Sequence, residues 1–481
     1  MGEIKKLSHK DEETLLTTEI KELGAHETGW FCHCLPKRYL IALLTFGGLL
    51  NAFAMRVNLS VAIVDMVANK TAFDSNGTEY VLREADLYWD PAAQAMALSS
   101  FYYGYIVTQI PGGYLAARFG GKVVFGTGIL VNALLTLITP AAARTNVYLM
   151  ITLRIFIGLF QGMIYSSLYA IWSKWAPPHE RSVLTAISNA GSTSGTVLTM
   201  AVSGLIAHYL NWDWVFYFFG MFAALWCIFW FAFITDSPKD HPNISIKERD
   251  YIMSSLIFDG TEHKVTCIPW RKMLTSAPVW AFTIAHITSQ AGMYTMLTQL
   301  PTYIKRVLGF SLRDTGVLSA VPFVAMVIVM QAVAVLADHI RKRKYISMRF
   351  LRILINSVGF LSQALFLIAV GHTSNRNMTI AGFTLAVGMG GFLYSGYMVS
   401  HLDFAPRHAS ILFGFANCLA TIPGFLSPKI VSLLTPNDTH EEWRIVFFLT
   451  AGVYGFGMIV FAVFSSDRRQ EWDTYKEEHL K

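Results

Sequence analysis

Twelve apolar segments, each long enough to cross a lipid bilayer as a helix, constrain the fold of this sequence more than any other feature. A membrane-spanning helix needs about 20 mostly apolar residues. Charged residues make up only 15% of the 481-residue chain, against roughly 25% in an ordinary soluble protein. The sequence therefore predicts an all-α membrane protein of about twelve transmembrane helices. The segments cover residues 39–66, 92–116, 122–142, 147–171, 182–207, 213–235, 278–303, 314–337, 348–370, 378–402, 410–433 and 443–465.

The longest polar interruption divides the segments six and six, which indicates two six-helix halves and an internally duplicated transporter. Within the interruption, residues 245–256 have the pattern of a short amphipathic surface helix. We expect five regions along the chain. They are a cytosolic N-terminal tail (1–38), a first six-helix half (39–235), a cytosolic central loop (236–277), a second six-helix half (278–466) and a cytosolic C-terminal tail (467–481).

Basic residues in the short loops predict the orientation of the chain. The net charge of +6 comes from Lys and Arg that gather between the apolar segments, mostly on one side, so it indicates membrane topology and no nucleic-acid partner. Because basic loops stay in the cytosol, both termini are predicted to be cytosolic. The loop 67–91 then lies on the opposite side, where its sequons at Asn69 and Asn76 are predicted glycosylation sites.

Arginines inside the apolar segments are the first functional signal, because a charge within a membrane span is costly. Arg56 lies well inside the first segment. In the fourth, Arg154, Gln161 and Tyr165 recur at a spacing that places them on one helix face. Two alternatives remain open for the arginines: a side chain that reaches the membrane interface, or tight packing through the neighbouring Gly158 and other small residues.

Polar stripes also mark the seventh, tenth and eleventh segments. His286, Gln290 and Tyr294 recur every four residues in the seventh, where a packed core histidine is the alternative reading. Ser400 lies in the tenth, within a cluster of Tyr and His, and Asn417 lies in the eleventh. Because the clearest stripes occur in segments one, four, seven and ten, they predict one lining helix in each three-helix repeat around a central cavity.

Two buried arginines with few buried acids predict a positively charged cavity, for which a small anion is the natural ligand. Arginine keeps its charge at any working pH and offers a bidentate fork to carboxylate or phosphate. A short basic turn follows both the second and the eighth segment, and Arg118, Asp338 and Arg341 lie in these turns. They are predicted to form a cytosolic latch that closes the inner gate, with simple topogenic charge as the alternative.

The two turns, Gly113–Lys122 and Ala334–Arg343, resemble the signature of the major facilitator superfamily, although Ala117 stands where its first-half acid is usual. Four further stretches resemble its anion:cation symporter family, which includes sialin, the vesicular glutamate transporters and the sodium–phosphate cotransporters. The stretches are RVNLSVAIVDMV from Arg56, FYYGYIVTQIPGGY from Phe101, WSKWAPPHERS from Trp172 and HLDFAPR from His401.

The resemblance implies the major facilitator fold, an anionic substrate, and roles in substrate binding for Arg56 and Arg154. Sialin and the vesicular glutamate transporters have a glutamate, thought to carry the coupled proton, where Gln161 stands here. An amide cannot carry that proton. Ser289 stands where the glutamate transporters have an arginine. These departures leave the anion open among sialate, acidic amino acids and phosphate, and the driving ion open between sodium and protons, with membrane potential as a third driving force.

The predicted function is secondary active anion transport by alternating access; a non-transporting anion sensor on the same scaffold is the alternative. We find no nucleotide-binding loop, nucleophile elbow, zinc-spaced ligand set or paired carboxylate in the segments, so neither an enzyme nor a bound metal or cofactor is expected, apart from the coupling ion. Asp11, Leu15 and Leu16 resemble an acidic dileucine sorting signal. If sorting adaptors recognise this signal, the protein is expected in a lysosomal or vesicular membrane; the plasma membrane is the alternative location. A monomer is expected.

Overall fold

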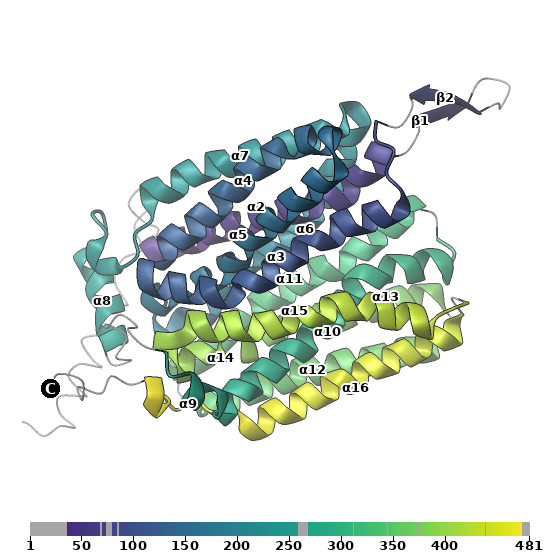
Figure 1. The fold of residues 1–481 in the computed structure, drawn as a ribbon. Helices are drawn as coiled ribbons and strands as arrows, with labels where there is room; N and C mark the ends of the chain where they lie inside the picture. Colours follow the sequence, from purple (N-terminus) through teal and green to yellow (C-terminus); the bar gives the residue numbers. More distant parts are fainter. Residues whose placement is uncertain are drawn as a thin grey trace, which may run out of the picture.

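Twelve helical segments form one long bundle in the computed structural model, which describes residues 36–67, 70–73, 79–83, 86–257, 268–310, 312–343, 345–373, 375–437 and 439–473 (Figure 1). The first half consists of α2 (Lys37–Val67), α3 (Pro91–Phe119), α4 (Gly121–Thr145), α5 (Val147–Trp175), α6 (Arg181–Tyr209) and α7 (Trp212–Phe233). The second half consists of α10 (Ala277–Arg306), α11 (Leu312–Arg343), α12 (Met348–His372), α13 (Arg376–Gly388), α14 (Tyr397–Phe404), α15 (Ala409–Leu434) and α16 (His440–Phe464).

Short elements connect these helices. The central loop contains η2 (Pro238–Asp240), α8 (Ile246–Ile257) and α9 (Trp270–Leu274), so an α-helix occupies the position where the sequence predicts an amphipathic one. The other 3-10 turns are η1 (Pro178–Glu180), η3 (Met389–Tyr394), η4 (Pro406–His408) and η5 (Glu471–Asp473). The loop after α2 contains the antiparallel strands β1 (Lys70–Phe73) and β2 (Glu79–Arg83), which the all-α prediction missed because so short a hairpin lies outside the apolar segments.

Ten helices in the described part of the chain are long and apolar enough to cross a membrane. The long helices α3 and α10 are not among them, although they have 29 and 30 residues. Both helices carry Tyr, Gln, Ser and Thr, and both contribute polar side chains to a central cavity. The mean hydropathy of α3 and α10 is therefore lower because these helices line the cavity with polar side chains.

The tenth predicted segment is broken, where the sequence predicts one continuous span over 378–402. Its path runs from α13 through η3 to the short α14. Glycines explain the break, because Gly391 lies so close to α11 that a Cβ atom there would come within 2.6 Å of the Met330 backbone nitrogen. Gly396 then separates η3 from α14. The break places α14 at one end of the bundle, where it becomes part of a closure described below.

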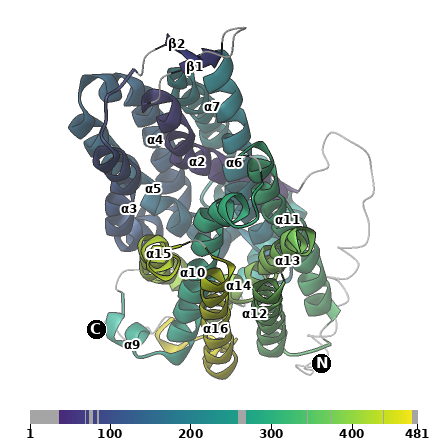
Figure 2. The same ribbon diagram turned by 90° about the vertical axis from the view of Figure 1, so that its right-hand side faces the viewer.

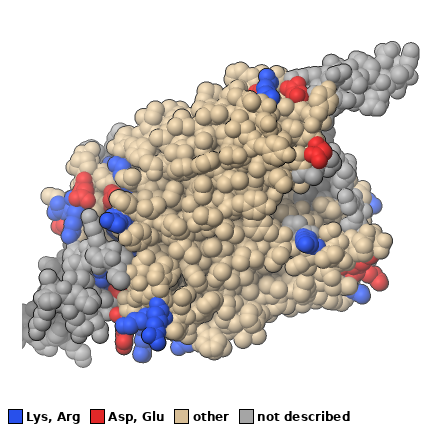
Figure 3. All heavy atoms as spheres, viewed as in Figure 1, with Lys and Arg blue, Asp and Glu red and all other residues tan. Residues whose placement is uncertain are grey.

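The bundle has two ends, which we name by their landmarks. The tail face is the end where α2 begins and where α8 and α9 lie; the hairpin face is the end that carries β1 and β2 (Figure 1). On the side of the molecule shown in Figure 3, the described charged residues gather toward these ends and a broad uncharged band separates them. Such a band is what a lipid-embedded surface requires.

The two halves meet along two sides of the bundle, and α15 contacts both α3 and α5 of the first half. On one side α3 packs against α15, and on the other α6 packs against α11, as the view onto the hairpin face shows (Figure 2). The α3–α15 contact is tight, since a Cβ atom at Gly414 would lie 2.3 Å from the Gln109 carbonyl oxygen. Within the first half, α3 packs against α5, and α2 packs against α6. The space between the halves holds the cavity.

Candidate functional site

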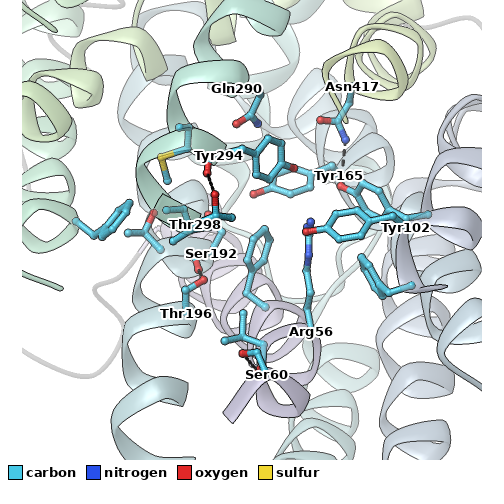
Figure 4. A pocket seen from close by; sticks show the side chains of 18 of the residues that line it. Arg56, Ser60, Tyr102, Tyr165, Ser192, Thr196, Gln290, Tyr294, Thr298 and Asn417 are labelled. Carbon is cyan, nitrogen blue, oxygen red and sulfur yellow. Dashed lines mark hydrogen bonds between the residues drawn. The ribbon is translucent and has the colours of Figure 1, made fainter. Parts of the chain in front are cut away.

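A cavity of about 400 Å³ lies between the two halves and is lined by residues of both. Ser60, Met200 and Thr298 line it and are exposed, and each belongs to the hairpin-face part of its helix. The cavity therefore opens toward the hairpin face. Figure 4 shows its polar lining, with Arg56 from α2 opposite Gln290 and Tyr294 from α10.

Arg56 is the central charge of this cavity. Its guanidinium carbon lies over four aromatic rings, 4.9 Å from the ring centroids of both Phe101 and Tyr102, 5.1 Å from that of Tyr105 and 5.5 Å from that of Phe53. Such cation–π contacts offset part of the cost of removing the charge from water. No carboxylate in the described part of the chain lies within ion-pair distance of it. An anion entering the cavity would supply the missing counter-charge.

Arg154 from α5 supports the backbone that carries Arg56. Its Nη1 donates to the Met55 carbonyl at 3.4 Å and its Nη2 to the Arg56 carbonyl at 3.1 Å. Its guanidinium also lies over the Phe101 ring, at 5.6 Å from the centroid. The side chain lines the cavity but is only 3% exposed, and its Nε has no hydrogen-bond partner among the residues that the structure describes. Arg154 thus adds a second positive charge next to Arg56 while its terminal nitrogens hold α2 in place.

The rest of the wall is neutral. Among the predicted residues, Tyr165, Gln290, Tyr294 and Asn417 line the cavity. The polar wall is completed by Ser60, Tyr102, Tyr105, Ser192, Thr193, Thr196, Thr298 and Tyr394. Arg56 and Arg154 are the two charged residues of the lining within the described part of the chain. The cavity therefore presents its positive charge from the first half and neutral polar and apolar groups elsewhere.

Three residues that the sequence predicts in the pocket lie outside its lining. The Gln161 amide is buried and donates to the Ala52 carbonyl at 2.8 Å. His286 is fully buried in a network behind the wall. Ser400 belongs to the tail-face side, where its hydroxyl donates to the Tyr397 carbonyl at 2.6 Å. Helical spacing shows which residues share a helix face, but it does not show how far a side chain lies from the cavity. Larger neighbours such as Tyr165 line the cavity in place of these residues.

Asn417 connects the cavity wall to His286 and joins the two halves. Its Nδ2 donates to Tyr105 Oη at 3.1 Å and to Gln109 Oε1 at 2.8 Å, so its Oδ1 faces the His286 Nε2 at 3.0 Å as an acceptor. In the neutral form of His286, Nε2 would then donate to Asn417 and Nδ1 would accept from Tyr397 Oη, which lies at 3.0 Å. The network links α3 with α10, α14 and α15.

A buried ionic network closes the tail face. Asp403 of α14 pairs with Arg352 at 2.9 Å, with Arg181 at 3.1 Å and with Arg341 at 3.5 Å. Arg181 begins α6 in the first half, while the other members come from the second half. Asp338 completes the closure, since its carboxylate accepts from the Val183 amide at 2.8 Å and from the Ser182 amide at 3.4 Å at the first turn of α6. We call these five residues (Arg181, Asp338, Arg341, Arg352 and Asp403) the tail-face network.

The predicted latch residues divide between two places. Asp338 and Arg341 belong to the tail-face network, with Asp338 at the N-terminus of a helix, where a carboxylate is favourable. Arg118 lies apart from it, and its guanidinium donates to Tyr114 Oη at 3.3 Å. The corresponding turn of the first half is instead tied by Asp236, which accepts from the Lys122 amide at 2.8 Å. The two halves therefore differ at the latch, because Ala117 offers no acid there.

Sequence reasoning missed the aromatic frame and most of the tail-face network. Phe101, Tyr102 and Tyr105 lie on one face of α3, and the aromatic run of that segment was the signal. Arg181, Arg352 and Asp403 lie at predicted segment ends, where charge is expected for topology alone. Their spacing along the chain gave no indication that they meet in space.

Comparisons with known proteins agree with this architecture. Residues 44–428 match the family described as Major Facilitator Superfamily. Sialin from Ovis aries is 41% identical over 453 residues, which cover 91% of each chain, and human sialin is 40% identical with the same coverage. Human vesicular glutamate transporter 2 is 39% identical over 486 residues, covering 98% of this chain and 83% of that protein.

Two solved structures share the fold at low sequence identity. The proton:xylose symporter XylE has a TM-score of 0.63 at 16% identity, covering 89% of this chain and 94% of that one. FucP in its outward conformation has a TM-score of 0.64 at 12% identity, covering 89% of this chain and 99% of that one. At these identities the similarity concerns the fold alone.

Proposed function

The chain belongs to the major facilitator superfamily, in which it is a secondary transporter of small anions, and we propose that its substrates are organic acids whose carboxylate binds Arg56. The comparisons give no support to a sensor that binds an anion without transporting it. The relatives named as glutamate transporters favour an organic anion, and so does the size of the cavity. A volume of about 400 Å³ falls in the range of sites for small organic molecules, and inorganic phosphate would leave most of it unfilled.

One observation carries the proposal: the half-buried Arg56 guanidinium lines the cavity without a carboxylate partner among the described residues. A carboxylate would accept two parallel hydrogen bonds from it and neutralise its charge. The aromatic rings around Arg56 come from the first half, and the neutral wall of the second half lines the same cavity. The body of the acid would then contact Gln290, Tyr294 and the hydroxyl groups of α6.

We propose that the structure corresponds to the state open to the hairpin face, with the tail face closed. Transport would require the tail-face network to separate while the cavity closes at the hairpin face. The Arg181–Asp403 ion pair and the hydrogen bonds from the first turn of α6 to Asp338 are among the contacts that must break. Substrate release on the tail-face side would follow from this separation.

The driving force is proposed to be membrane potential or sodium. The cavity lining contains no carboxylate or histidine among its described residues, and Gln161 cannot bind a proton. One charge moved through 100 mV is worth about 2.3 kcal/mol, enough for roughly fifty-fold accumulation. Potential alone is therefore adequate for a carrier of monovalent anions.

Uptake into proteoliposomes tests both parts of this proposal. Labelled sialate, glutamate, urate and phosphate would be offered while the sodium gradient, pH gradient and potential are varied one at a time. We expect saturable uptake of at least one organic acid, driven by potential or sodium and unchanged by a pH gradient alone. Uptake of phosphate only would contradict the substrate class. A pH gradient that suffices by itself would contradict the coupling and would assign the proton to another group.

We propose that the tail face is cytosolic and that the hairpin face borders the lumen of lysosomes or vesicles. The basic loops support this orientation, and the relatives named vesicular transporters support the compartment. The proposed sorting signal (Asp11, Leu15, Leu16) and the sequons at Asn69 and Asn76 lie outside the described residues. Adaptors would read the former from the cytosol, and we propose that the transporter functions as a monomer.

Glycan mapping in cells tests the orientation. Asn69 and Asn76 would be replaced by Gln, singly and together, and the electrophoretic mobility of the expressed protein measured. Each single replacement is expected to increase the mobility by one step, and the double replacement by both steps, because each removes one glycan. Asn243, in a sequon of the central loop, is the matched control, and Asn243→Gln should leave the mobility unchanged. The opposite pattern, with a glycan at Asn243 only, would mean that the tail face lies in the lumen.

A further inference from the structure

The seam between α6 and α11 is tight in the tail-face half of the bundle, where the two helices lie side by side (Figure 2). Ala186 and Ala190 of α6 are buried, and they belong to one apolar cluster with Met330 and Ala334 of α11. Gln331 of α11 also donates from its Nε2 to the Ala186 carbonyl at 3.1 Å. In this half the seam therefore separates the space between the halves from the surrounding lipid.

The same face of α6 becomes exposed toward the hairpin face. Steps of three and four residues lead from Ala190 along this face to Thr193, Val197, Met200 and Gly204. Along these steps the exposed fraction rises from 6% at Thr193 to 48% at Met200. Gly204 is exposed, and a Cβ atom there would have no atom of the described residues within 4 Å. In this half α6 therefore leaves a gap beside α11, which we call the side opening.

The side opening connects the cavity with the lipid. Met200 lines the cavity, and the rim next to it is apolar and exposed, with Leu205 on α6 and Val324 on α11. On the opposite side the seam is closed beside the cavity, because the ring of Tyr102 on α3 contacts the ring of Phe425 on α15 at 5.0 Å between centroids. A molecule in the hairpin-side leaflet therefore has an apolar path through the side opening into the cavity.

A ligand that uses this path must combine an apolar chain with an anionic end. Val197, Met200 and Gly204 offer the chain apolar or small neighbours along α6. The charge must be negative, because Arg56 and Arg154 are the charged residues of the described cavity lining. A carboxylate on Arg56 with a methylene chain between α6 and α11 meets both conditions.

We propose that the side opening binds the chain of a single-chain amphipathic carboxylate, such as a fatty acid of the surrounding leaflet, whose carboxylate binds Arg56. This inference rests on the proposed function and adds an inhibitory ligand to the same site. Closure of the hairpin face requires α6 and α11 to approach each other in this half, so a chain held between them opposes closure. Long-chain acids would therefore bind and hold the cavity open, whereas short acids would be carried.

Protection of a thiol in the side opening tests this inference. Gly204→Cys, in a variant without the five native cysteines, would be alkylated with N-ethylmaleimide in proteoliposomes. Dodecanoate at ten times its half-saturating concentration should slow the alkylation about tenfold by mass action. Acetate, which lacks the chain, and methyl dodecanoate, which lacks the charge, should leave the rate unchanged.

Two further variants make the protection specific. Leu205→Cys places the thiol on the next residue, which is 60% exposed beside the side opening, and it is the matched control with an unchanged rate. Arg56→Ala, combined with Gly204→Cys, should abolish the protection by dodecanoate. Equal protection of both thiols, or protection that survives Arg56→Ala, would mean that dodecanoate acts through the bilayer and that the inference is wrong.

Uptake by the wild type separates this inference from the function on which it rests. Dodecanoate should inhibit uptake of labelled glutamate or N-acetylneuraminate, and methyl dodecanoate should not. If either acid is transported but dodecanoate neither protects the thiol nor inhibits uptake, the inference is wrong and the proposed function stands. If no organic acid is transported although dodecanoate protects the Gly204→Cys thiol, the side opening stands and the proposed function fails.

Discussion

Replacement of Arg56 by alanine is expected to lower kcat/KM for uptake of the substrate anion at least about 30-fold, the effect of losing about 2 kcal/mol or more from a buried charged contact. The guanidinium is the cavity charge framed by Phe101, Tyr102 and Tyr105 without a carboxylate among the described residues. Without it, the carboxylate would enter a site whose nearest cation, Arg154, already donates to the backbone of α2. Uptake of labelled substrate into proteoliposomes measures the loss.

Two further variants make this result specific. Arg56→Lys keeps the charge but loses the bidentate fork, so its uptake is expected to fall between wild type and Arg56→Ala. Arg118→Ala removes an arginine from the tail face outside the cavity and is expected to retain wild-type uptake. Equal uptake by Arg56→Ala and wild type, with both proteins folded and reconstituted, would mean that the anion binds elsewhere.

Asp403→Asn is expected to destabilise the tail-closed state by about 3–5 kcal/mol, the cost of breaking a buried ion pair by removing one partner. The carboxylate, with a side chain only 5% exposed, lies between the guanidinium groups of Arg181, Arg341 and Arg352. The neutral amide would leave these three charges close together with Asp338 as the remaining acid of the network. We therefore expect a lower midpoint of thermal unfolding and a larger population open to the tail face.

Cysteine labelling distinguishes an opened gate from a generally weakened fold. The probe is a cysteine at the buried Ala334 of α11, which packs against α6, in a variant whose five native cysteines are replaced. A membrane-impermeant reagent added on the tail-face side should label this cysteine faster when Asp403→Asn is also present. Asp250→Asn, at an exposed position of α8, is the control for the loss of one negative charge. Unchanged unfolding and labelling in Asp403→Asn would show that the tail-face network does not hold the gate.

The structure also suggests how the cavity and the gate communicate. The short α14 carries the cavity residue Met398 and, five residues later, Asp403 of the tail-face network. Between them lies His401, which is fully buried among the rings of Tyr169, Phe282 and Phe413. A shift of this helix upon substrate binding would displace Asp403 as well as Met398, because both belong to the same eight-residue helix.

The fold could be predicted from the sequence because lipid imposes a simple rule. Each span must satisfy its own backbone hydrogen bonds, so the twelve apolar segments had to be helices, and their six-and-six division indicated the two halves. The break between α13 and α14 could not be read from hydropathy. It depends on the close approach of Gly391 to α11, which is a contact between segments about sixty residues apart.

The site was only partly predictable for a related reason. The cost of a charge within a membrane span singled out Arg56, and helical spacing singled out Tyr165, Gln290 and Tyr294; all four line the cavity. Spacing along a helix does not give the distance of a side chain from the cavity. Gln161 and His286 lie on the same faces and were predicted to line the pocket, but both lie behind its wall. The tail-face network joins residues from four helices, and no local pattern predicts such a meeting.

The central claim is that this chain carries anions between the two faces through the cavity at Arg56, and counterflow tests it most directly. Proteoliposomes loaded with a high concentration of unlabelled N-acetylneuraminate or glutamate would be diluted into a trace of the same labelled acid, with no ion gradient and no potential. We predict transient accumulation of label above equilibrium in wild type and its loss in Arg56→Ala, whatever the coupling ion is. Label that never exceeds the level in protein-free liposomes, for either acid, would contradict the account.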